Sequence, residues 1–264
     1  MLQIKNLCKV FNNNTVNGKK IFHGLNLTVN KGDFITIIGS NGAGKSTLLN
    51  IISGTIPIDQ GAIYLEDIEI SKLLEHKSNR FIGRVFQDPS KGTSPSMTIL
   101  ENMSMAKNKG KRFGFSFGID KKNISYFKEL LSKLDLGLEE KINSKVGLLS
   151  GGQRQALTLI MTAMTEPKLL LLDEHTAALD PKTSEKIIKL TDNIVKERKL
   201  TTLMVTHNLN HAINLGNRLI MLHEGKVILD IEGKEKKNLT RGKLLQLFGE
   251  NKGKDLFSDR SLFA

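Results

Sequence analysis

Residues 34–52 read FITIIGSNGAGKSTLLNII, and much of the fold can be inferred from this stretch. It begins with a run dominated by apolar residues, which predicts a buried strand of a parallel sheet. A glycine-rich turn follows and matches the pattern G-x-x-x-x-G-K-[ST] over residues 39–46. The apolar residues after the turn recur with helical spacing. A strand, a glycine-rich turn and a helix in this order are typical of a loop that binds phosphate groups.

Each residue type in this turn has a physical role in holding phosphate. Glycine lets the backbone wrap so that several N–H groups point at one anion, and the following helix directs its positive end at the same place. Lys45 supplies a charge to the β- and γ-phosphates, and the Ser46 hydroxyl is a ligand for Mg²⁺. We therefore expect ATP with Mg²⁺. The predicted ATP-binding residues of the loop are Gly39, Ser40, Asn41, Gly42, Ala43, Gly44, Lys45, Ser46 and Thr47.

A second apolar run, residues 169–172, ends in two acids, Asp173 and Glu174. Ligands of a parallel sheet bind at the carboxyl ends of its strands. We expect Asp173 to reach the Mg²⁺ shell through water, and Glu174 to polarise an attacking water as general base. The alternative is a strand that ends in a solvated acidic turn, which the phosphate loop makes less attractive.

The remaining sequence alternates predicted strands and helices, which favours an α/β fold with a parallel sheet. Another buried strand is predicted at 202–205, and hairpins at 56–70 and 219–231. The stretch 88–118 is loop-rich and basic. Helical spacing occurs at 124–138, 153–164, 184–198 and 244–248.

Length and composition exclude several classes of protein. A chain of 264 residues can bury a large core without disulfides, and its single cysteine, Cys8, cannot form an internal one. No apolar run approaches the roughly 18 residues of a spanning helix, and the N-terminal sequence does not resemble a signal peptide. The net charge of +12, from 39 basic and 27 acidic residues, suits nucleic acid, an anionic membrane face or phosphate ligands, or simply a solvated lysine-rich surface.

Residues 149–153 read LSGGQ, which resembles the signature sequence of the ATP-binding cassette (ABC) ATPases. The resemblance extends from residue 2 to about residue 232. It implies a P-loop (RecA-like) ATPase core with a small antiparallel β-subdomain and an inserted α-helical subdomain. The expected ABC domain covers 1–250, with the core at 1–88 and 157–233, the helical subdomain at about 89–156, and a C-terminal tail at 251–264.

Other landmarks of the family can be assigned by the same resemblance. Gln87, in VFQDP, resembles the Q-loop glutamine, which contacts Mg²⁺ or the attacking water. His207 resembles the switch histidine at the γ-phosphate, with a capping or core histidine as the alternative. Phe11 resembles the aromatic residue that stacks on adenine, with an ordinary core residue as the alternative. Asp180, in AALDP, resembles the aspartate at the dimer interface.

The signature also has a local role that can be read from its residue types. Ser150 is a favourable N-cap, and the two glycines let the helix N-terminus approach a phosphate. One position departs from the family pattern, because His175 stands where a proline is usual after the catalytic glutamate. We expect His175 to pack locally, with a chemical role as the alternative. The residues expected to contact ATP across a dimer are Leu149, Ser150, Gly151, Gly152 and Gln153.

The resemblance implies a homodimer, because phosphate loop and signature lie on opposite sides of the family's ATPase subunit. It further implies integral membrane permease subunits, an extracellular solute-binding protein in the same system, and a cytoplasmic position at the inner face of the cell membrane. We expect an importer of an amino acid or another small solute, without direct nucleic-acid binding. The segment 107–118 is expected to be a solvated loop, or to lie near the permease groove or the membrane. The alternative is a soluble ABC ATPase that acts on nucleic acid, the ribosome or cluster assembly without a permease.

Overall fold

The computed structural model describes residues 1–12, 18–111 and 118–251, with side chains up to residue 247. The chain divides into two compact units. Unit 1 holds residues 1–79 and the chain from residue 201 onward, and unit 2 holds residues 80–200. The expected division into core and helical subdomain, at 88/89 and 156/157, stays a prediction. The expected tail lies outside the described residues beyond Asn251.

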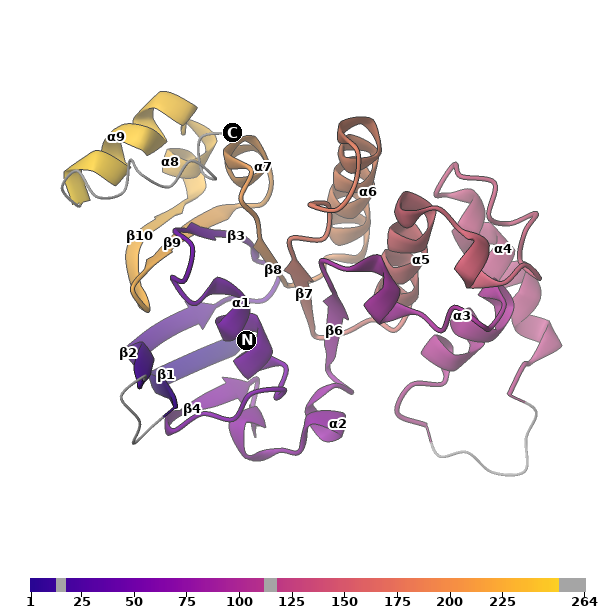
Figure 1. Ribbon diagram of the computed structural model, residues 1–264, viewed down its shortest axis with the longest axis horizontal. Helices are drawn as coiled ribbons and strands as arrows, with labels where there is room; N and C mark the ends of the chain where they lie inside the picture. The colour runs from indigo at the N-terminus through magenta and orange to yellow at the C-terminus, as the bar shows by residue number, and fades with distance from the viewer. Residues whose placement is uncertain (13–17, 112–117, 252–264) are drawn as a thin grey trace. The chain divides into compact units, whose positions relative to one another are not determined.

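Unit 1 contains a small antiparallel sheet of four strands in the order β2-β1-β4-β5 (Figure 1). In β1 buried and exposed side chains largely alternate, as expected of a sheet with one face toward a core. The predicted hairpin at 56–70 is confirmed, because β4 pairs antiparallel with β5. The strands are β1 (Leu2–Phe11), β2 (Lys19–Val29), β4 (Gln60–Leu65) and β5 (Ile68–Glu69).

The second group of strands in unit 1 is centred on β3 (Phe34–Gly39), whose six residues are all buried. β3 pairs in parallel with β8 (Thr202–Val205) on one side and β9 (Arg218–His223) on the other. β9 pairs antiparallel with β10 (Lys226–Glu232). These pairings confirm the predicted buried strands and the hairpin at 219–231. Two helices of unit 1 follow the parallel strands, α1 (Lys45–Ile52) after β3 and α7 (Leu209–Asn214) after β8.

Two further helices of unit 1, α8 (Gly233–Lys237) and α9 (Arg241–Asn251), follow β10. Leu239 and Leu244 bury their side chains in a cluster with Ile38, from β3, and residues of α7 and β9. Lys236 is also buried, and its ammonium group donates hydrogen bonds to the carbonyls of Ala212 and Ile213 at the end of α7. The short α2 (Glu75–Ser78) completes the α-helices of unit 1 in the described chain.

Unit 2 is mostly helical (Figure 1). Its two strands, β6 (Ile82–Val85) and β7 (Leu169–Asp173), pair in parallel, and α5 packs against α6, α3 and α4. Apolar stripes explain these contacts, because α4 buries Phe127, Leu130 and Leu131 on one face. The helices are α3 (Ile99–Lys107), α4 (Ile124–Ser132), α5 (Gly151–Ala163) and α6 (Pro181–Arg198).

The stretch 88–118, described from the sequence as loop-rich, also contains the helix α3, which lies within the range predicted for the helical subdomain. Its start is fixed by a capping box: the Thr98 hydroxyl accepts from the Glu101 N–H, and the Glu101 carboxylate accepts from the Thr98 N–H. Ile99, Leu100 and Met103 are buried. The T-x-x-E spacing ahead of an apolar face was the signal for this helix, and the basic residues around it masked the pattern.

Of the helices in the described chain, none has the length and apolar character needed to cross a lipid bilayer.

The buried Lys236 leads to a prediction about stability and pH. Burial lowers the pKa of Lys236 to about 8, from an ordinary value of 10.5. Between these pH values the unfolded chain binds more protons at this site than the folded chain, so the free energy of unfolding should rise with pH. We expect urea unfolding to show this rise, at most about 1.4 kcal/mol per pH unit.

The rise should disappear in Lys236→Met and persist in the matched variant Lys237→Met, whose lysine is exposed on the same helix. Equal pH dependence in wild type and Lys236→Met would contradict the assignment of the shift to this ammonium group.

Candidate functional site

Two glycines of the turn between β3 and α1, Gly39 and Gly44, stand where a side chain would collide with neighbouring atoms. A Cβ on Gly39 would overlap the Leu222 carbonyl of β9. Gly44 has a φ of 99°, in the left-handed region, and its Cβ would lie 2.9 Å from the Phe22 ring. The buried Lys45 ammonium donates to the carbonyls of Gly39 (2.7 Å) and Ser40 (2.9 Å). The Lys45 side chain therefore binds the backbone of its own loop.

The N-terminus of α1 lacks the side-chain cap that several other helices have. Side-chain oxygens of Thr98, Ser150, Asp180 and Asn208 accept backbone N–H groups at the starts of α3, α5, α6 and α7. Gly44 at the N-cap of α1 makes no such bond, and the first turn of α1 carries no acidic residue. The positive end of this helix is thus available to an anion.

Lys19 is a residue near the loop that the sequence analysis missed. Its ammonium nitrogen would lie 3.7 Å from a Cβ on Gly42, so a second amino group stands beside the phosphate loop. In the sheet register Lys19 pairs with Phe11, the residue assigned to adenine. Phe11 is partly buried, and the Lys9 ammonium lies 5.5 Å from its ring centroid. Nothing in the lysine-rich sequence distinguishes Lys19 from other lysines. Only the pairing of β1 with β2 places it beside the phosphate loop.

His207 follows β8 at the level at which the phosphate loop leaves β3. Val205 pairs with Ile37 in the parallel register, and the Thr206 N–H donates to the Ile37 carbonyl at 3.2 Å. His207 therefore stands two residues past Val205, as Gly39 stands two residues past Ile37. Within unit 1 the structure brings together the phosphate loop, Phe11 (through Lys19) and the end of β8.

The two acids predicted from the second apolar run lie at the end of β7. Asp173 is its last residue and is largely buried. The Arg84 guanidinium, from β6, donates to Asp173 Oδ2 at 3.0 Å. Glu174 has a φ of 45°, a left-handed conformation that costs a residue other than glycine about 1–3 kcal/mol. Such strain is common where a catalytic side chain has to be directed away from the strand.

Gln87 follows β6 and is exposed. The turn around it is held from both sides: the Gln155 side chain of α5 donates to the Phe86 carbonyl at 3.0 Å, and the Asp88 carboxylate accepts from the Ser90 N–H. Hydrogen bonds from the backbone and the side chain of Ser90 lower the pKa of the Asp88 carboxyl. The backbone on each side of Gln87 is thus fixed, while its side chain faces solvent.

The signature residues form the start of α5 through a second capping box. The Ser150 hydroxyl accepts from the Gln153 N–H at 3.3 Å, and the Gln153 side chain accepts from the Ser150 N–H at 3.1 Å. The predicted N-cap is therefore confirmed. A Cβ on Gly152 would overlap the Thr183 side chain of α6, so this glycine also serves helix packing. Ser150 and Gly151 remain exposed.

Asp180 and His175 both lie next to α6. Asp180 caps this helix by accepting from the Thr183 N–H at 3.0 Å, and hydrogen bonds from Thr183 lower the pKa of its carboxyl. His175 is 1% exposed, and its Nε2 lies 3.0 Å from the Thr191 hydroxyl. The interpretation of His175 as a residue that packs locally agrees with this burial.

The donor set suits Mg²⁺ bound together with a nucleotide. The described chain contains no group of three or more histidine, cysteine or acidic side chains that could hold a metal alone. Mg²⁺ in nucleotide sites uses one or two protein oxygens, with phosphates and water as the other ligands. Ser46 and Asp173 offer such hard oxygen donors.

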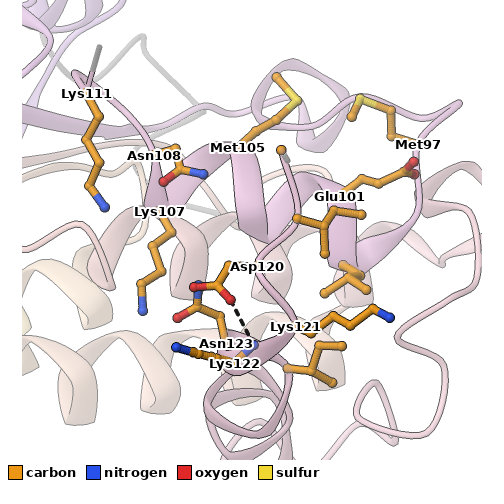
Figure 2. Close-up of a pocket in the computed structure, with 14 residues that line it drawn as sticks. Met97, Glu101, Met105, Lys107, Asn108, Lys111, Asp120, Lys121, Lys122 and Asn123 are labelled. Carbon is orange, nitrogen blue, oxygen red and sulfur yellow. Dashed lines mark hydrogen bonds between the residues drawn. The ribbon is translucent and has the colours of Figure 1, made fainter. Parts of the chain in front are cut away.

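A pocket in unit 2 lies between the end of α3 and the start of α4 (Figure 2). Lys107, which lines it, holds its ammonium 4.4 Å from the Tyr126 ring centroid. Asp120 also lines the pocket and accepts from the Lys122 N–H. None of the predicted site residues lines this pocket. Of the segment 107–118, residues 112–117 lie outside the described chain, so its expected place near the permease or membrane stays a prediction.

Residues 22–177 match the family described as ABC transporter. The chain belongs to this family. It is 54% identical over 248 residues to the tyrosine transport ATP-binding protein of Clostridioides difficile, a match that covers 94% of this chain and 98% of that protein. It is 34% identical to the methionine import ATP-binding protein of Clostridium tetani, over 95% of this chain and 78% of that protein.

A solved ATP-binding cassette, a dimer in a post-hydrolysis state bound to ADP and Pi, is 31% identical with a TM-score of 0.75. The match covers 88% of this chain and 98% of that chain. The ABC protein described here therefore has the predicted cassette fold, binds and hydrolyses ATP, and serves a transporter. The alternative of a soluble ABC ATPase without a permease is not supported by these relatives.

The position of Lys19 beside the phosphate loop leads to a prediction about ATP affinity. Lys19→Ala removes an exposed positive charge near the nucleotide phosphates, so ATP binding should weaken by about threefold. Lys20→Ala is the matched control, because Lys20 is the next residue of β2 and also exposed. Equilibrium binding of a fluorescent ATP analogue measures both. Equal losses in the two variants would show that only net charge matters.

Proposed function

We propose that this chain is the ATPase subunit of an importer for an amino acid, with tyrosine or a related aromatic amino acid as the first candidate. The observation that carries this proposal is the 54% identity to a tyrosine transport ATP-binding protein along nearly the full length of both chains. A relative at 34% identity is named for methionine import, which supports import as the direction of transport.

In the proposed site the phosphate loop binds the ATP phosphates through its N–H groups and Lys45. The contacts of Lys45 with its own loop support this role, because the ammonium would exchange the carbonyls of Gly39 and Ser40 for phosphate oxygens. Phe11 stacks on adenine. Mg²⁺ would be held by Ser46, by Asp173 through water and by Gln87, and it would neutralise charge on the phosphates.

Hydrolysis in this proposal is the in-line attack of water on the γ-phosphorus. Glu174 accepts a proton from the water as the new P–O bond forms and the bond to the β-phosphate oxygen breaks, which releases ADP and phosphate. His207 contacts the γ-phosphate and positions Glu174. The place of Glu174 directly after the last residue of β7 supports this role, because ligands of a parallel sheet bind at the carboxyl ends of its strands.

We further propose a symmetric homodimer in which the signature of each subunit contacts the ATP of its partner. The exposure of Ser150 and Gly151 at the start of α5 supports this contact, as does the dimeric structure of the related cassette. Asp180 lies at the dimer interface. The remaining partners of the proposed system are permease subunits in the membrane, beneath which this chain sits on the cytoplasmic side, and an extracellular solute-binding protein.

Glu174→Gln tests the assignment of the general base. Without a base, ATP should stay bound and hold two subunits together, because the γ-phosphate is not lost. We expect ATP turnover to fall at least about a hundredfold, and ATP with Mg²⁺ to shift the variant from monomer to dimer in size-exclusion chromatography. The matched control is Glu185→Gln, an exposed acid of α6. Wild-type turnover in Glu174→Gln would refute the assignment.

Uptake by cells tests the solute. Cells of the source strain that carry only Glu174→Gln should lose uptake of radiolabelled tyrosine and keep uptake of methionine. Competition by unlabelled phenylalanine in wild-type cells then measures how far the system accepts other aromatic amino acids. Loss of methionine uptake with intact tyrosine uptake would move the substrate to the second relative's class, and no loss of either would contradict an amino-acid importer.

A further inference from the structure

Arg84 is a cation that the sequence analysis did not single out, and the sheet register carries it to Asp173. Arg84 pairs with Leu171 in the parallel alignment of β6 and β7. Asp173 stands two residues beyond Leu171, and side chains two residues apart share one face of a strand. The guanidinium therefore reaches one pleat along its own face to Asp173 Oδ2, at 3.0 Å.

This ion pair is largely removed from water. The Arg84 side chain is 11% exposed and that of Asp173 is 13% exposed. The guanidinium also stacks on Phe86, with 4.6 Å between its central carbon and the ring centroid. The backbone at Phe86 is held by a hydrogen bond from the Gln155 side chain to the Phe86 carbonyl. Arg84 is thus held from two directions, and in this position it keeps a positive charge against the Asp173 carboxylate.

A fixed cation at a carboxylate opposes the approach of a second cation, and the opposition is stronger where water is excluded. The strand register brings the guanidinium to Asp173, and its contact with the Phe86 ring favours this position. A divalent ion drawn to Asp173 must therefore share the carboxylate with Arg84 or displace it.

We propose that Arg84 is a positioning residue that competes with Mg²⁺ for the Asp173 carboxylate and thereby sets the Mg²⁺ concentration that nucleotide binding requires. The inference rests on the proposed role of Asp173 in holding Mg²⁺. Arg84 keeps the carboxylate oriented while no nucleotide is bound, and it makes Mg²⁺ bind more weakly than it would at an unpaired aspartate.

The experiment measures binding of a fluorescent, non-hydrolysable ATP analogue, first in EDTA and then with increasing Mg²⁺. In Arg84→Met the Mg²⁺ concentration at half-saturation should fall at least about threefold, because the opposing charge is gone. Arg84→Gln, which keeps a hydrogen-bond donor but no charge, should behave in the same way and guards against misfolding of the methionine variant. Arg84→Lys, which keeps the charge but loses the planar guanidinium, should stay closer to wild type than either neutral variant.

Lys168→Met is the matched control, because Lys168 holds a cation 5.3 Å from the Phe81 ring centroid just before β7 begins, at the other end of the two strands. We expect no change in its Mg²⁺ requirement. An unchanged or higher requirement in both Arg84→Met and Arg84→Gln overturns the role of Arg84 alone. If binding by the wild type does not respond to Mg²⁺, the proposed metal role of Asp173 fails as well.

Discussion

Backbone packing at Gly39 constrains the rest of the nucleotide-binding region. β3 has neighbours on both sides and is buried along its whole length, so its carboxyl end can turn only where no side chain obstructs the Leu222 carbonyl. From that turn the chain enters α1 through Gly42 and Gly44, which both have left-handed backbone conformations, and the helix begins without a side-chain cap. Strand packing therefore shapes the turn to which the proposed site assigns the phosphates, and in that proposal Lys45 adds charge and the Ser46 hydroxyl a metal ligand.

Charged groups near the predicted chemistry have protein partners in the nucleotide-free chain. Lys45 donates to the carbonyls of its own loop, and Arg84 pairs with Asp173. A buried charge without a partner is costly, so each of these contacts offsets part of the cost of burying its charge. In the proposed site, a bound nucleotide replaces the carbonyl partners of Lys45, and Mg²⁺ shares or replaces the contact of Arg84 with Asp173. In the proposed site the affinity for ATP and Mg²⁺ is therefore the difference between the contacts made to the ligands and those given up within the protein.

The side chains of Ser150 and Asp180 combine a structural role with the role that the family resemblance assigns to them. Ser150 and Asp180 are N-caps of α5 and α6, and each cap fixes a helix start that the sequence analysis linked to the dimer. A substitution at either position would change local helix geometry together with any contact across the dimer. The positive net charge, by contrast, has little part in the phosphate loop beyond Lys45 and Lys19.

Residue order alone was sufficient to predict the parallel strands, the phosphate loop, the acids at the end of β7 and the cap at Ser150. These features depend on local pattern: apolar runs, glycine spacing and a capping residue a few positions from its partner. The sequence did not reveal Lys19 beside Gly42, the ion pair of Arg84 with Asp173, or the burial of Lys236 against α7. The residues in each of these contacts are far apart in the sequence and follow no recognisable pattern. They meet because strand pairing and helix packing bring their side chains together. For α3 the local signal was present at Thr98 and Glu101, whereas the contacts of the lysines and the arginine could come only from the tertiary fold.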